Sequence, residues 1–410
     1  MLALTVNRAW RVFAVFAAAH FLSYFFRSAN AVIAGDLTRS LGLGPAQLGL
    51  MSSLFFGAFA LAQLPLGSAL DRFGARAATS LLMLAGVVGA AVFAAAPDAV
   101  WLGVGRALLG LGTAGILMGG LKALSVIHPP RRFAAVSGML TAAGSSGALV
   151  ATAPLAALDR AVGWRAIFAG GAAVLLLAAV AIAAAAGTGR NREHAAEAGT
   201  EGFGDIFTSG AFWRLAFMGF AVMGTTFAYQ SLWAGPYLTE AAGLPATRAG
   251  NVLLLLGIGL VLGFFTSGWL AARFGLARVL AVGTAVMVAA QATLAAAAGR
   301  GAPAAVYGGL LFLLAAGGSF ALLLYAQANT LFPPHLTGRV VSAINLFMFL
   351  GGFALQWGIG VVVARLSPAA GAAGASAGAY ATALLLTAAL CTVALLWYLP
   401  TLARARAVSA

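Results

Sequence analysis

Four polar side chains near the amino terminus recur at the spacing of one helical face. His20, Tyr24, Arg27 and Asn30 follow one another at intervals of three or four residues, so a helix would place them on one side. An arginine binds carboxylates and phosphates through its planar fork of donors. A histidine can exchange a proton near neutral pH, or it can be a neutral packing residue. The pattern predicts a site for an anion.

These side chains belong to a chain far more apolar than a soluble protein. Of 410 residues, 62% are hydrophobic and 8% are charged, and 23 basic against 9 acidic side chains give a net charge of +14. A soluble domain carries about 25% charged residues, so the composition excludes an ordinary globular or disordered protein. The basic residues stand singly between apolar runs, which argues against nucleic acid as a partner. We expect a lipid bilayer around the chain.

Twelve apolar runs are long enough to cross a membrane as helices, which takes about 20 residues each. We therefore expect an all-α membrane protein with twelve transmembrane helices in two pseudo-symmetric six-helix halves. The halves are residues 1–187 and 212–410, and a cytoplasmic linker, residues 188–211, holds four of the acidic residues. The runs begin near Trp10, Ala46, Arg76, Asp98, Phe133, Trp164, Phe212, Ala246, Ala277, Pro303, Gly338 and Ala373.

The distribution of basic residues predicts the orientation of these spans. Loops on the amino-terminal side of the membrane carry more than twice as many basic residues as the opposite loops, so the positive-inside rule predicts that both termini are cytoplasmic. Nearly all the basic residues are arginine, and alanine and glycine abound, as in a GC-rich bacterial genome. We expect a bacterial cytoplasmic (inner) membrane. The single cysteine, Cys391, excludes an internal disulfide and a cysteine-rich metal site, and we expect a monomer with neither cofactor nor metal.

A sequence motif in the loop after the second run is repeated in the second half of the chain. Internal repeats of this kind are how many secondary transporters are built, with the substrate site near the midplane between the halves. The first copy is defined by Gly67, Asp71, Arg72, Gly74 and Arg76, and the second by Gly268, Ala272, Arg273, Gly275 and Arg278.

The first copy resembles the loop signature of the major facilitator superfamily, Gly-x-x-x-Asp-Arg-x-Gly-x-Arg, at every defined position. Arg106-x-x-x-Gly110-x-Gly112 resembles the second motif of that family. The resemblance implies a transporter that works by alternating access, in which a contact of Asp71 with the other half latches the outward-open state. For Arg106 it implies a proton-coupling or cavity role. The alternatives are a purely topogenic loop and an arginine that snorkels outward.

The first span also resembles a subgroup, the organophosphate:phosphate antiporters, through Tyr24-Phe-Phe-Arg27-Ser-Ala-Asn30. In that subgroup one arginine in helix one and another in helix seven hold the phosphate. The matching stretch of the seventh span, residues 227–230, has no basic residue. We therefore expect a monoanion, carboxylate or zwitterion held by one arginine together with neutral donors. The candidate donors are Tyr229, Gln230, Trp233 and Asn345.

The position of the acidic residues supports this assignment of Arg27. An arginine inside a membrane span costs a few to ten or more kcal/mol unless it is hydrated or paired. Every acidic residue is predicted in a loop, in the linker or at a helix end, so the sequence offers no carboxylate at mid-membrane. We expect Arg27 to face the substrate. The alternative is a structural arginine that is hydrated or paired with Asp36.

These observations predict a secondary active transporter that moves a small organic anion or zwitterion, with a coupling proton or a counter-anion. One alternative is a proton-coupled multidrug exporter, but the chain lacks both a mid-membrane carboxylate and the Gly-Pro-x-x-Gly-Gly motif of drug antiporters in the fifth span. Another is a non-transporting receptor of the same fold. We do not expect an enzyme, because the sequence has no Ser-His-Asp order, phosphate loop or His/Cys metal spacing.

Overall fold

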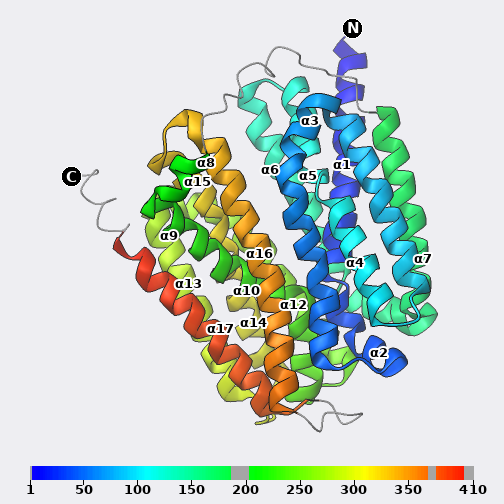
Figure 1. Cartoon of the computed structure of the whole chain (residues 1–410), viewed down its shortest axis with the longest axis vertical. Helices are drawn as coiled ribbons and strands as arrows, with labels where there is room; N and C mark the ends of the chain where they lie inside the picture. The colour runs from blue at the N-terminus through cyan, green and yellow to red at the C-terminus, as the bar shows by residue number, and fades with distance from the viewer. Residues whose placement is uncertain (1, 186–202, 368–374, 401–410) are drawn as a thin grey trace. The chain divides into compact units, whose positions relative to one another are not determined.

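The computed structural model describes residues 2–185, 203–367 and 375–400, and these residues form helices joined by short turns (Figure 1). The amino-terminal helices are α1 (Leu2–Ser28), α2 (Asn30–Leu41), α3 (Pro45–Ala95), α4 (Ala99–Thr113), α5 (Ile116–Ile127), α6 (Pro130–Val150) and α7 (Ala153–Ala185). A second series comprises α8 (Phe203–Thr208), α9 (Gly210–Met218), η2 (Gly219–Met223), α10 (Gly224–Ala228), η3 (Tyr229–Trp233), α11 (Ala234–Pro236) and η4 (Tyr237–Ala241). The remaining helices are α12 (Ala246–Phe274), α13 (Leu276–Ala297), α14 (Ala304–Ser319), η5 (Phe320–Leu322), α15 (Leu323–Leu331), α16 (Pro334–Leu366) and α17 (Ala377–Tyr398).

The all-α membrane fold predicted from the sequence is confirmed. In the described part of the chain, ten helices are long and apolar enough to cross a membrane. The longest, α3, contains both the second and the third predicted span, because its backbone leaves the helical conformation at Gly74. The fifth predicted span corresponds to α6, whose apolar stretch Val136–Val150 is shorter. Most predicted span starts fall within a few residues of an observed helix start or kink, because glycine and proline mark the turns between the spans.

Glycine is required where the repeated loop motif turns. Gly74 has a φ of 78°, and Gly275, its counterpart in the second copy, has a φ of 89°. A side chain with a Cβ rarely adopts such a positive φ, whereas glycine does so without steric cost. The two copies of the motif therefore make the same kind of turn, which supports the internal repeat as a structural one.

The chain forms two compact units. Unit 1 contains residues 1–29 and 54–201, and unit 2 contains residues 30–53 and 202–410. In unit 1, α1 packs against α5, α6 and α7, and in unit 2, α12 packs against α14 while α13 packs against α14 and α17. The predicted division into residues 1–187 and 212–410 concerns the parts that move in transport, and it stays a prediction. Residues 186–202, most of the predicted linker, lie outside the described residues.

The seventh span, Gly210–Ala241, has an unusual backbone and is largely buried. Three π-helical turns, η2, η3 and η4, interrupt its α-helical hydrogen bonding. In its apolar stretch of 18 residues 72% of the residues are buried, against 33% in the corresponding stretch of α7. A span buried to this extent contacts other helices on most of its sides, and π-helical turns occur frequently at functional sites.

Candidate functional site

Arg27 lies in unit 1 among aromatic rings. It belongs to the last turn of α1, and it is only 3% exposed. Its guanidinium carbon lies 4.6 Å from the ring centroid of Tyr24 and 5.3 Å from that of Phe59 on α3. A cation over aromatic faces gains about 2 kcal/mol when both are removed from water. The rings therefore stabilise the guanidinium by cation–π contact and restrict the orientation of its plane.

Arg106 is the second buried arginine of unit 1, and it is completely inaccessible. Its Nη1 donates a hydrogen bond of 2.6 Å to the carbonyl oxygen of Phe26, while Nε and Nη2 have no hydrogen-bond partner among the described residues. Gly110, one turn further along α4, lets this helix approach α3 closely, because a Cβ there would collide with the carbonyl oxygen of Phe55. The Arg106-x-x-x-Gly110 spacing thus brings the guanidinium to the Phe55 ring, 4.9 Å from its centroid.

The two arginines share the ring of Phe55. Arg27 lies 5.9 Å and Arg106 lies 4.9 Å from its centroid. Within the described ranges, the buried polar side chains include these two arginines and no aspartate or glutamate. Burying a cation costs several kcal/mol even after relaxation. The interior of unit 1 therefore concentrates positive charge on one aromatic cluster, Tyr24, Phe55 and Phe59.

His20 extends this polar face by one turn. Its ring meets the Tyr24 ring edge to face at a centroid distance of 5.1 Å, and its Nε2 is buried with no partner in the part of the chain that the structure describes. Gly144 on α6 provides the space, because a Cβ there would collide with the His20 ring, and Gly147 approaches the backbone of Phe21 in the same way. These glycines seat α6 against the polar face of α1.

The predicted residues in unit 2 make separate contacts with neighbouring helices. The Nδ2 of Asn30 donates to the Ser52 hydroxyl at 2.7 Å. The indole Nε1 of Trp233 donates to the carbonyl oxygen of Gln356 at 2.8 Å. The hydroxyl of Ser231 donates to Oε1 of the same glutamine at 2.7 Å. These bonds tie α2 to α3, and η3 to α16.

Tyr229 and Asn345 also bond within unit 2. The Tyr229 hydroxyl lies 3.4 Å from the Thr387 hydroxyl, which in turn donates to Gln291 at 2.7 Å. Asn345 accepts a hydrogen bond of 2.6 Å from the Tyr325 hydroxyl, and Gln230 is buried. The structure thus brings His20, Tyr24, Arg27 and Arg106 together in unit 1, whereas the unit 2 candidates take part in separate helix–helix bonds.

The loop motif carries an ion pair within unit 1. Lys122 on α5 pairs with Asp71 and donates to the carbonyl oxygen of Leu70 at 2.9 Å. The side chain of Asp71 is 67% exposed, and the guanidinium of Arg72 lies 5.4 Å from the ring centroid of Phe73. Sequence reasoning did not find Lys122 as the partner of Asp71. The predicted contact of Asp71 with the other half stays a prediction.

Sequence reasoning also missed the aromatic neighbours of the arginines and the glycine that leaves space for the His20 ring. Phe55 and Phe59 are four residues apart, so the sequence does show that they share one face of the second span. It does not show which helix that face contacts. Among the residues described, no group of three or more His, Cys, Asp or Glu side chains is placed to hold a metal ion.

Known proteins with similar sequences are bacterial transporters. The chain is 27% identical over 159 residues to an uncharacterized transporter of Bacillus subtilis (strain 168), a match covering 39% of this chain and 37% of the relative. It is 29% identical over 147 residues to a probable L-galactonate transporter of Escherichia coli (strain K12), covering 36% and 32%. These matches thus span about a third of the length of each curated relative.

Solved structures of the same architecture cover nearly the whole chain. A bacterial homologue of the human lysosomal transporter Spinster, in an inward-facing and unoccupied conformation, has a TM-score of 0.72 at 17% identity, covering 95% of this chain and 96% of the other. The D-xylose-proton symporter has a TM-score of 0.73 at 16% identity, covering 93% and 97%. Residues 16–356 match the family described as the Major Facilitator Superfamily. The chain therefore belongs to the Major Facilitator Superfamily.

Proposed function

We propose that this transporter moves a small organic anion or zwitterion by alternating access, and that Arg27 binds the negative group of the substrate. The observation that carries the proposal is the pair of buried arginines that share the ring of Phe55. Two cations in one apolar cluster raise the local potential, and a carboxylate matches the planar fork of an arginine. Arg27 is already buried, so its attraction for an anion is screened less than it would be in water.

The chemistry of Arg27 favours a carboxylate over a divalent phosphate. The aromatic rings of Tyr24 and Phe59 lie against its guanidinium, and residues 227–230 of the seventh span supply no second basic residue for a divalent group. The relative named as a probable L-galactonate transporter supports this choice, because galactonate is an organic monoanion. The similarity of residues 24–30 to the organophosphate:phosphate antiporters remains a resemblance in one segment. The neutral donors predicted on the seventh span stay predictions.

The test is uptake into proteoliposomes of labelled L-galactonate, other carboxylates, phosphates and amino acids. We expect uptake of at least one carboxylate or zwitterion. Replacing Arg27→Ala should reduce it by about 30-fold or more, because truncating one partner of a buried charge pair costs 2–5 kcal/mol. Arg27→Lys should retain part of the activity, since it keeps the charge and loses the planar fork.

Arg39→Ala is the matched control, because the Arg39 side chain is 78% exposed and lies outside the aromatic cluster. It should transport like the unmodified protein. Both variants should show the elution profile of the folded protein on size-exclusion chromatography. Full uptake by a folded Arg27→Ala variant would overturn the proposal. Uptake only of cationic drugs would overturn it in favour of a multidrug exporter.

Coupling by a proton or a counter-anion is a further part of the proposal. His20 is the candidate for proton exchange, because its buried Nε2 has no partner within the described residues and its ring contacts Tyr24, the neighbour of Arg27. A proton on His20 would add a third cation beside the two arginines and would strengthen anion binding. An inward proton gradient should then stimulate uptake, and the stimulation should be lost in His20→Asn.

A further inference from the structure

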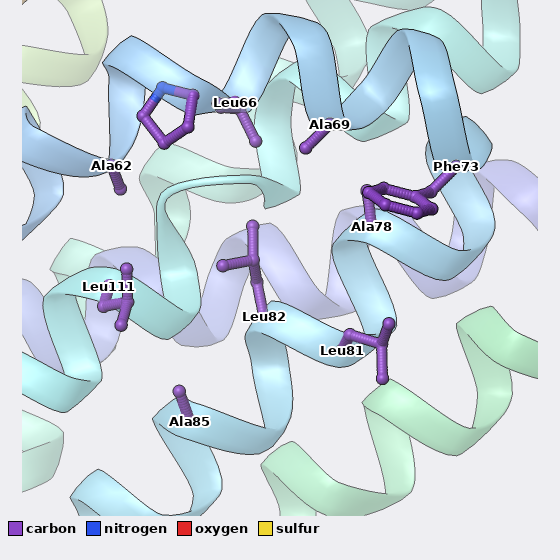
Figure 2. Close-up of a pocket in the computed structure, with 10 residues that line it drawn as sticks. Ala62, Leu66, Ala69, Phe73, Ala78, Leu81, Leu82, Ala85 and Leu111 are labelled. Carbon is purple, nitrogen blue, oxygen red and sulfur yellow. The ribbon is translucent and has the colours of Figure 1, made fainter.

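An apolar groove lies in unit 1 between α3 and α4, with a volume of about 290 Å³. The backbone break at Gly74 divides α3 into two arms, residues 45–73 and 75–95, and both arms line the groove. Figure 2 shows Leu82 between the arms, Phe73 beside Ala78 at one end, and Leu111 of α4 at the other. We call this the α3–α4 groove, and its labelled lining side chains are all apolar.

The groove has a buried floor and an exposed rim. Leu66 and Ala78 on the floor are almost inaccessible, whereas Phe73 and Leu81 on the rim are 54% and 63% exposed. The groove therefore opens on the side of the exposed rim. Its walls belong to membrane-spanning segments, and apolar cavities of this kind do not hold water. A flexible hydrocarbon chain is the occupant that such a surface selects.

The end of the groove at the loop motif carries positive charge. Arg72 is exposed, and its guanidinium lies 5.4 Å from the ring centroid of Phe73, the rim residue at that end. The carboxylate of Asp71 beside it is paired with Lys122, so it does not offset the charge of Arg72. The sequence predicts that this loop faces the cytoplasm, and the cytoplasmic leaflet is rich in anionic lipids that bind such basic sites.

We propose that the α3–α4 groove binds an acyl chain of one anionic phospholipid, whose phosphate is held by Arg72. The two halves of the lipid match two adjoining surfaces, because the hydrocarbon lies along the apolar wall and the headgroup meets the cation at its end. The inference is independent of the transported substrate. The loop motif would then bind a lipid through Arg72, besides making a turn at Gly74 and an ion pair through Asp71.

The second copy of the motif offers a matched comparison. Arg273 lies 5.7 Å from the ring centroid of Phe274, which repeats the geometry of Arg72 and Phe73. Beside it Ala271, Val279 and Leu323 pack together with Phe320 and Leu276, as Leu66, Leu70 and Ala78 pack with Ala69 and Leu82 at the first copy. The cation and the ring are thus the same in both copies, while the α3–α4 groove is lined by residues of the helices that carry the first copy.

The test is native mass spectrometry of the detergent-solubilised protein, supplied with equal amounts of phosphatidylglycerol and phosphatidylcholine that carry identical acyl chains. We expect the protein to retain phosphatidylglycerol in preference to phosphatidylcholine. Arg72→Gln should reduce that retention about fivefold, the weight of one basic residue at an anionic lipid surface. Arg273→Gln should retain the lipid like the unmodified protein. Ala69→Phe, which fills the groove, should lower retention of both lipids.

Four results would overturn the proposal. Equal retention of the two lipids would show that the site does not select an anionic headgroup. Equal losses of phosphatidylglycerol in Arg72→Gln and Arg273→Gln would indicate a general effect of surface charge. Normal retention of phosphatidylglycerol by Arg72→Gln would show that Arg72 does not hold the lipid phosphate. Arg72→Gln changes an exposed side chain, so it decides the matter even if Ala69→Phe does not fold. Displacement of phosphatidylglycerol by inorganic phosphate alone would indicate a site for the free anion and would also overturn the proposal.

Discussion

Arg106 shows how one residue can trade stability for function. It is fully buried, and its Nη1 donates a hydrogen bond to the Phe26 carbonyl. Its Nε and Nη2 have no partner among the side chains and backbone groups described, and each buried donor left unsatisfied costs roughly 1–3 kcal/mol. We expect a protein to keep such a costly group where its electric field is needed. The neighbouring cation is Arg27, which lies near the same Phe55 ring.

We predict that Arg106→Met raises the thermal unfolding temperature of the detergent-solubilised protein while it lowers transport. Methionine fills a similar volume without charge, so the two unsatisfied donors disappear at the cost of one bond to Phe26. The paired measurements are a melting curve and uptake into proteoliposomes. Arg248→Met changes an exposed arginine and should alter neither. A lower unfolding temperature for Arg106→Met would show that the arginine is a net stabiliser.

At the scale of the elements, glycines decide which helices approach one another. In unit 2 a Cβ on Gly235 would collide with the carbonyl oxygen of Ala31, and one on Gly49 would lie 2.9 Å from the carbonyl oxygen of Gln356. These close approaches hold residues 30–53 against the seventh and eleventh spans. If residues 1–187 move as one half, as the sequence predicts, these contacts must separate once in each transport cycle.

We predict that Gly235→Val loosens this packing and exposes Ala31. The measurement is the rate at which a maleimide labels Ala31→Cys in a Cys391→Ala background. Labelling should be slow with Gly235, because Ala31 is buried, and faster with valine. Gly378→Val on α17 is the control, since a Cβ there meets nothing within 4 Å. Equal labelling rates with glycine and valine at position 235 would contradict the role assigned to this contact.

Individual elements show what could be predicted from the sequence. Span starts were predicted closely because Gly74, Pro130 and Pro334 interrupt apolar runs, and such interruptions are local. The face shared by His20, Tyr24 and Arg27 follows from helical periodicity alone. The ring of Phe55 between two arginines could not be predicted, since it depends on how α3 and α4 are rotated about their axes. The same holds for the bond between Tyr229 and Thr387, which joins residues far apart in the chain.

At the scale of the whole molecule, we expect the charge of +14 mainly to orient the chain in the membrane. Most basic residues are predicted in loops or at helix ends, where the positive-inside rule gives them a role in topology, and Arg27 and Arg106 are the buried exceptions within the described ranges. This division separates the topogenic arginines from those that shape the candidate site.

We predict that both termini face the cytoplasm. Green fluorescent protein fused after Ala410 should fluoresce, because it folds in the cytoplasm, and alkaline phosphatase at the same place should be inactive. Alkaline phosphatase inserted at Asp98, in the loop between α3 and α4, should be active, since that loop is predicted to lie outside the cytoplasm. Active phosphatase at the carboxyl terminus would reverse the predicted orientation and move the loop motif to the outer surface.

The three π-helical turns of the seventh span bear on how this chain compares with its relatives. A π turn closes its hydrogen bond over five residues where an α turn uses four, as Ala242 does with the carbonyl of Tyr237. Each such turn holds one residue more than an α-helix of equal height, and so it absorbs a single-residue insertion without rotating the residues beyond it by the roughly 100° of one α-helical step. We therefore expect this span to accept an insertion or deletion of one residue at a π-helical turn.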